Sequence, residues 1–238
     1  MGCGASKIDL DAFLTPQRGV NPLIEGTTEL AVGGRAVVTC SQPLMLLTVR
    51  ENKFHIKISV DGALFATLSF DRETFDRTKK GVCGTIVATD KEGKLAAIVK
   101  QDKGSAHSFR DGRETVSTVY SASPRHASQA AALTFKETPM YAAAELKLGS
   151  GANQVAQDVL KAVGVAVHDA TADGGFSPEP SMALKYVQGG WRVLKGQDGL
   201  GVASVRQMTL APGVDPLLCV LAFMEKAAYS ELKLGGGA

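Results

Sequence analysis

The feature that most constrains the fold is an apolar segment near the C-terminal end, residues 217–224. Asp215 can cap a helix and Pro216 suits its first turn, so we expect a helix over about 215–233. Apolar residues would cover every face of its first two turns, and on the surface such a helix would expose a large apolar patch. Eight helical residues rise only about 12 Å, which is too little to cross a bilayer. The sequence therefore predicts that this helix is buried in the protein's own core.

Short runs rich in Val, Ile, Leu, Phe and Thr follow one another from about residue 36, with turn residues at intervals of about ten. In the clearest unit, Lys53–Val60 alternates apolar and polar residues, and the Asp61-Gly62 pair after it supplies the positive φ angles of a type I′ hairpin turn. A second hairpin is predicted across residues 90–93. The spacing is typical of a sheet sandwich or a barrel, and with the buried helix it favours a β-meander that encloses the helix. The predicted strands are 43–49, 53–60, 63–70, 84–89, 94–100, 115–120, 132–136, 141–148, 182–187, 191–195 and 202–210.

The remaining segments are assigned from their glycines, prolines and apolar periodicity. Residues 1–35 contain several prolines and glycines and few large apolar side chains, so we expect a flexible tail that acts as a spacer before a single domain over 36–238. Within the domain, apolar residues on one helical face predict a short helix over 153–163, closed by Gly164. Residues 170–180 are predicted to form a loop.

The first seven residues fit the N-myristoylation pattern, in which Gly2 becomes the first residue and Ser6 stands at the sixth position. One myristoyl chain binds a membrane with an association constant of only about 10⁴ M⁻¹, so stable anchoring needs a second acyl chain or a basic patch. Asp9 and Asp11 oppose a basic patch, which makes S-palmitoylation of Cys3 the most economical second signal. The alternatives are an unmodified N-terminus and an exposed free thiol.

Charge and cysteine spacing argue against several classes of function. The formal net charge is +2, and the basic residues are scattered, so we expect no nucleic-acid binding. The four cysteines are widely separated and indicate neither a disulfide framework nor a zinc site. The N-terminus lacks the basic start and apolar run of a secretory signal. We therefore expect the protein on the cytoplasmic face of a membrane, with a cytosolic pool.

Few residues suggest catalysis or metal binding. His168 and Asp169, with Asp173 nearby, could form a metal-ligand set, but the other histidines lie in unrelated contexts, and ordinary loop residues are the preferred interpretation. The serines lack a Gly-x-Ser-x-Gly elbow, and Cys83 has no identifiable partner base. Trp191 is more typical of a core anchor than of a ligand platform. We predict no catalytic residue, no metal site and no cofactor.

Short strands with Asp-x-x-Gly hairpins, followed by an apolar helix after Pro-Gly-Val-Asp, resemble the tubby-like barrel superfamily. This superfamily includes tubby C-terminal domains, plant LURP-one-related proteins and phospholipid scramblases. The matching residues are 54–70, the turn 87–94, and 205–224 with its Ala-Pro-Gly-Val-Asp sequence at 211–215. They cover about a third of the chain, and the strands between them fit by pattern alone.

The resemblance implies a mainly β (α+β) fold, a closed antiparallel β-barrel of short strands around a buried hydrophobic C-terminal helix. It also implies work at a membrane without enzymatic activity, because tubby domains bind phosphoinositides through basic side chains and scramblase-like members are acylated. Scramblases carry an acidic calcium-binding stretch before the last helix, whereas residues 196–201 here hold one carboxylate, which argues against calcium-driven scrambling. The nearest basic cluster, weighed against an ordinary solvated loop, comprises Arg72, Arg77, Lys79 and Lys80.

We therefore predict a membrane-tethered, non-enzymatic module that binds lipids or proteins. Its partners would be membrane lipids, reached through the acyl chains, and anionic phospholipid headgroups such as phosphoinositides, bound by the basic cluster. Two alternatives stay open at this point. One is an enzyme with its active site in the mouth of a β-barrel. The other is an acyl-anchored scaffold that gathers protein partners at the bilayer.

Overall fold

The computed structural model describes residues 9–17, 23–24, 34–41, 53–71, 85–101, 115–122, 131–138, 164–171, 173, 175–187, 190–204 and 207–223. These residues contain a short helix, α1 (Leu10–Phe13), and a second helical segment, residues 216–223, that we call the C-terminal helix. Between the helices lie β1 (Ala36–Cys40), β2 (Lys53–Val60), β3 (Ala63–Asp71), β4 (Thr85–Asp90), β5 (Leu95–Gln101), β6 (Thr115–Ser121), β7 (Ala131–Thr138), β8 (Gly164–Asp169), β9 (Met182–Val187), β10 (Gly190–Lys195), β11 (Asp198–Ala203) and β12 (Gln207–Leu210).

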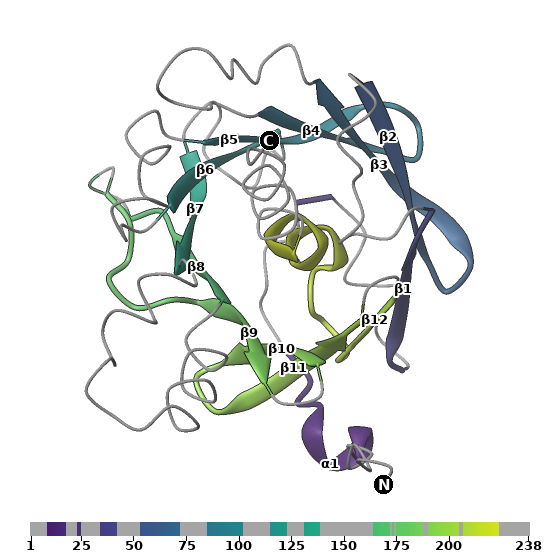
Figure 1. The fold of residues 1–238 in the computed structure, drawn as a ribbon, viewed down its shortest axis with the longest axis vertical. Helices are drawn as coiled ribbons and strands as arrows, with labels where there is room; N and C mark the ends of the chain where they lie inside the picture. The colour runs from purple at the N-terminus through teal and green to yellow at the C-terminus, as the bar shows by residue number, and fades with distance from the viewer. Residues whose placement is uncertain are drawn as a thin grey trace, which may run out of the picture.

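The strands form a single antiparallel meander. Each strand from β2 to β12 pairs with its neighbour in the chain, and β1 pairs with both β2 and β12, so the order of hydrogen-bonded strands returns to its start. We call this arrangement the ring. Figure 1 shows the strands around the C-terminal helix, with α1 on the outside near β10 and β11. The prediction of a mainly β fold built from antiparallel strands is confirmed.

The two predicted hairpins are present, because their turn residues adopt the required backbone angles. Asp61 and Gly62 have φ angles of 49° and 84°, as a type I′ turn needs, and Asp61 Oδ1 accepts a hydrogen bond from the Val37 N–H at 2.8 Å. In the second turn, Asp90 Oδ1 accepts from the N–H groups of Glu92 and Lys94, each at 2.9 Å. These carboxylates fix the register of four neighbouring strands.

Two features of the C-terminal half differ from the prediction. The predicted strand 202–210 is two strands, β11 and β12, which reverse after Ser204, where the Ser204 N–H and Oγ both donate to the Gln207 carbonyl oxygen. β11 also starts earlier than predicted, because its glycines hid a strand whose neighbours approach closely. The strand β8 was not predicted: Gly164 opens it and pairs with both Thr138 and Lys185. The predicted helix over 153–163 and the predicted strands 43–49 and 141–148 lie outside the described residues.

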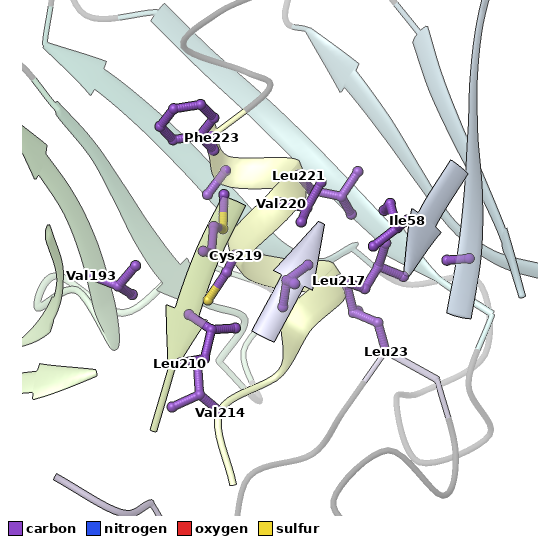
Figure 2. Packing of buried hydrophobic residues seen from close by; sticks show 14 of the residues in the cluster. Leu23, Ile58, Val193, Leu210, Val214, Leu217, Cys219, Val220, Leu221 and Phe223 are labelled. Atoms are coloured by element: carbon purple, nitrogen blue, oxygen red, sulfur yellow. The ribbon is translucent and has the colours of Figure 1, made fainter. Parts of the chain in front are cut away.

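The space inside the ring holds the C-terminal helix and the inward side chains of the strands. Asp215 caps this helix, since its Oδ1 accepts from the N–H groups of Leu217 and Leu218 at 2.8 and 3.2 Å. Leu217 and Leu221 are fully buried, and Phe223 meets Trp191 edge to face with ring centroids 5.5 Å apart. Figure 2 shows these apolar side chains from the helix and the strands packed together. Burial of each such leucine stabilises the fold by about 1.5–3 kcal/mol.

Candidate functional site

The predicted lipid-attachment and headgroup-binding residues fall outside the described part of the chain. Gly2 and Cys3 precede Asp9, the first described residue. Arg72, Arg77, Lys79 and Lys80 lie between Asp71, which ends β3, and Thr85, which starts β4. The site is therefore built from the described residues that connect to these two segments.

The N-terminal segment begins with α1, which is capped and tied to the start of β1. Asp9 Oδ1 accepts a hydrogen bond from the Asp11 N–H at 3.0 Å and from the Ala12 N–H at 3.4 Å. The Asp11 carboxylate forms an ion pair with Arg35, the residue before β1. Both partners are exposed, so this pair contributes at most about 1 kcal/mol. Its effect is to hold α1 beside the ring rather than to stabilise the fold.

After α1, the backbone runs along the start of β11. Leu14 forms a parallel bridge with Gly199, and the Thr15 N–H donates to the Gly199 carbonyl oxygen at 2.7 Å. A Cβ atom at residue 199 would lie 2.2 Å from the Phe13 carbonyl oxygen, so only glycine permits this approach. The Arg192 guanidinium lies 5.5 Å from the centre of the Phe13 ring, and desolvation lowers the pKa of Arg192.

A second set of contacts joins the N-terminal segment to the start of the C-terminal helix. The Gln17 N–H donates to the Pro212 carbonyl oxygen at 2.8 Å. Gly213 has a φ of 80°, and a Cβ there would lie 2.1 Å from the Gln17 carbonyl oxygen. Further along, Leu23 is buried, and its N–H donates to Asp215 Oδ2 at 2.7 Å. The N-terminal segment is thus bound to the connection between β12 and the helix.

The Asp215 carboxylate binds both the C-terminal helix and the N-terminal segment. One carboxylate oxygen caps the C-terminal helix, and the other accepts the hydrogen bond from Leu23. The carboxyl group belongs to a residue that is only 4% exposed, so these hydrogen bonds replace water that the group has lost. The expectation that residues 1–35 form a flexible spacer is therefore wrong for residues 9–17 and 23, which pack on the body of the protein. Gly199 and Gly213 were not predicted to contact the N-terminal segment. The only sequence signal for these contacts is glycine itself, whose missing side chain lets another backbone segment approach closely.

The backbone hydrogen bonds that join the N-terminal segment to the body lie at one end of the ring. Ala36 pairs with Leu210 and Val38 with Val60, so the 61–62 turn lies at the same end as the start of the C-terminal helix. Ala66 pairs with Asp90, which brings the 91–94 turn to that end too. We call the turns 61–62, 91–94 and 196–197, with residues 211–215, the docking end. Asp71 and Thr85, which flank the basic cluster, lie at the opposite end.

The residues considered as metal ligands have separate local partners. His168 is buried, with Nδ1 2.8 Å from the Ser177 carbonyl oxygen, while Ser181 Oγ donates to Asp169 Oδ1 at 3.1 Å. Thr171 Oγ1 donates to Asp173, and this hydrogen bond lowers the pKa of the Asp173 carboxyl. Within the described ranges no group of three or more His, Cys, Asp and Glu side chains is placed to hold a metal ion. These contacts instead shape the loop between β8 and β9.

The two described cysteines are poor nucleophiles. Burial raises the pKa of the Cys40 thiol to about 12. The pKa of the Cys219 thiol is also raised, first by burial and then by the nearby Asp215 charge. Both therefore remain protonated at neutral pH, when the thiolate is the reactive form. Cys83 lies outside the described residues.

Comparison of the chain with protein-family models, with curated proteins and with solved structures gives no match. Among the described residues, no helix combines the length and the apolar character needed to cross a membrane.

Proposed function

We propose that this chain is a membrane-tethered, non-enzymatic lipid-binding module. In this proposal Gly2 carries a myristoyl group and Cys3 a palmitoyl group, on the cytoplasmic face of a membrane. The body is a closed barrel of the tubby-like kind, built around a C-terminal helix that continues to about residue 233. Anionic headgroups bind the basic cluster Arg72, Arg77, Lys79 and Lys80.

The observation that carries the proposal is the attachment of the N-terminal segment to the docking end. Thr15 and Gln17 donate backbone hydrogen bonds to the body, and α1 lies directly before them. Gly2 is seven residues from Asp9, a distance of at most about 25 Å even for extended chain. An acyl chain on Gly2 would therefore hold the body close to the bilayer.

The apolar character of the described residues inside the ring supports a role for the surface rather than for an enclosed active site. The buried residues of the ring are mostly apolar, and the C-terminal helix packs among them. The buried polar residues include His168, whose Nδ1 lies within hydrogen-bond distance of the Ser177 carbonyl oxygen, and Asp215, whose two carboxylate oxygens accept backbone hydrogen bonds. A ligand of the described part of the chain would then bind on the outside, as a lipid headgroup or bilayer does.

Acylation is tested first, by intact mass measurement and fractionation of the protein from its native cell. We expect loss of the initiator methionine and addition of two acyl chains. Gly2→Ala should release the protein to the soluble fraction, whereas Cys3→Ser should leave weak, reversible attachment, since one myristoyl chain binds with about 10⁴ M⁻¹. A free N-terminal amine on membrane-bound protein would overturn the proposal.

Headgroup binding is tested with the non-acylated full chain and phosphoinositide-containing vesicles. Replacing Arg72, Arg77, Lys79 and Lys80 by glutamine should weaken binding at least tenfold, because each phosphate contact is largely electrostatic. The control replaces three exposed lysines outside the docking end by glutamine: Lys57, Lys100 and Lys185. Equal losses in both variants would refute a specific site. No binding by the wild-type body would favour the acyl-anchored scaffold.

A further inference from the structure

Two large hydrophobic side chains are exposed in the described part of the chain. Leu64 and Leu95 each retain 43% of their surface in contact with solvent. Leu64 is the second residue of β3 and Leu95 the first of β5, so each lies within two residues of a hairpin turn. A single exposed leucine needs no explanation, but two at corresponding positions of successive hairpins define a surface.

The register places both leucines at the docking end. Ala66 pairs with Asp90, and Thr89 with Leu95, so β4 alone separates the strands that carry the leucines. The 61–62 and 91–94 turns therefore project from the same end of the ring as the connection that binds the N-terminal segment. Leu64 and Leu95 belong to the end from which the chain leads to Gly2.

We propose that the docking end is the surface that rests on the bilayer, with Leu64 and Leu95 inserted among the lipids; this inference rests on the proposed acyl tether. The chain length supports it. Asp9 and Gly2 are seven positions apart in the chain, a separation of at most about 25 Å. β3 alone is nine residues long, roughly 30 Å along the strand. With the opposite end on the bilayer, even a fully extended tether would be shorter than this strand. This inference therefore keeps the acyl tether of the proposed function and excludes contact of the basic cluster with the bilayer that holds the acyl chain.

The charges of this surface select a neutral bilayer as its partner. Around the leucines, two lysines, Lys91 and Lys94, stand against three carboxylates, Asp61, Asp90 and Glu92. Asp61 and Asp90 accept hydrogen bonds from backbone N–H groups, which keeps them on the turns. The surface therefore offers no excess positive charge to anionic lipid. Attachment should depend on the apolar side chains and little on ionic strength.

The expected effect follows from the area that the leucines have left to bury. Each has 43% of its surface exposed. Burying this surface in lipid should raise the affinity for vesicles roughly fivefold for each leucine, or about 25-fold for the pair. A myristoyl chain alone binds with an association constant of about 10⁴ M⁻¹. The myristoylated full chain should therefore bind phosphatidylcholine vesicles with an association constant of roughly 2.5 × 10⁵ M⁻¹. The double variant Leu64→Thr/Leu95→Thr should return to about 10⁴ M⁻¹.

The control is Ile98→Thr, an outward, partly exposed position on the wall of β5, away from the docking end. It should bind as the wild type does, at both 50 and 500 mM salt. Equal affinities of the wild type and the leucine double variant would overturn the inference, while the mass measurement would leave the acyl tether standing. An unmodified N-terminus in the native protein would overturn both.

Depth in the bilayer gives a second readout that does not depend on affinity. The native chain has one tryptophan, Trp191, which is buried. In myristoylated Leu95→Trp, brominated lipids should quench the added fluorescence, whereas in Lys100→Trp they should not. Quenching at Lys100→Trp alone would overturn the proposed orientation. A change from dimer to monomer in the leucine double variant, without quenching at Leu95→Trp, would identify the surface as a contact between two copies of the chain.

Discussion

Replacing Asp215 by alanine should uncouple the N-terminal segment from the body while also weakening the C-terminal helix. The carboxylate caps this helix through Leu217 and Leu218 and binds the Leu23 N–H. Loss of the cap costs about 0.5–2 kcal/mol. The buried Leu23 N–H would lose its partner, which costs about 1–3 kcal/mol more. Together the free energy of unfolding should fall by about 1.5–5 kcal/mol.

The loss in the free energy of unfolding is measured by urea unfolding of the full chain. Hydrogen exchange then shows which backbone amides lose protection. Asp215→Ala should lower the midpoint and speed exchange at the Leu23 amide. Asp215→Asn keeps one carbonyl oxygen and should lose about half as much. The control, Asp9→Ala, removes a cap from the short, exposed α1 and should cost at most about 1 kcal/mol without changing exchange at Leu23. Equal midpoints for Asp215→Ala and Asp9→Ala would refute the assignment of Asp215 as the joint between the two segments.

Other substitutions test the packing and the thiols. Leu221→Asp should abolish cooperative unfolding, because an unpaired charge would enter the core where Leu221 is fully buried; a sharp transition in circular dichroism would contradict this. Gly199→Val should free residues 9–17 for early cleavage in limited proteolysis, since its side chain would displace Phe13, and cleavage equal to that of wild type would count against it. The rate of Cys40 alkylation, measured by mass spectrometry, should continue to rise with pH above pH 10. The reason is that burial raises the pKa of the Cys40 thiol from an ordinary 9.0 to about 12. The same raised pKa contributes stability that is complete below pH 9 and lost as pH rises towards 12, and a midpoint independent of pH over this range would exclude it.

Features of the fold that depend on neighbouring residues could be predicted from the sequence. The Asp61-Gly62 turn followed from its positive φ angles, and the cap at Asp215 from its position before Pro216. The ends of β2 and β9 were predicted to the residue, since alternation of apolar side chains defines strands with one buried face.

Features that depend on distant contacts could not be predicted in this way. β8 and β11 begin with or contain glycines, whose weak strand preference is overcome by pairing on both sides. The docking of residues 9–17 depends on Gly199 and Gly213, nearly 200 residues away in the chain, and no local pattern indicates that pairing. The acylation motif, by contrast, is local: it consists of the first seven residues and does not depend on contacts with distant parts of the chain.

The pairing of β1 with β12 affects how the chain can assemble during synthesis. One edge of β1 stays unpaired until about 170 further residues, ending with β12, have been synthesised. The C-terminal helix, which packs inside the ring, is synthesised after β12. Until then the nascent polypeptide has an open sheet edge and an unfilled apolar face, both of which favour association with other chains. Long-range closure of this kind makes folding slow. A ribosome that stalls before Leu217 would thus release a product prone to aggregation rather than a smaller stable protein.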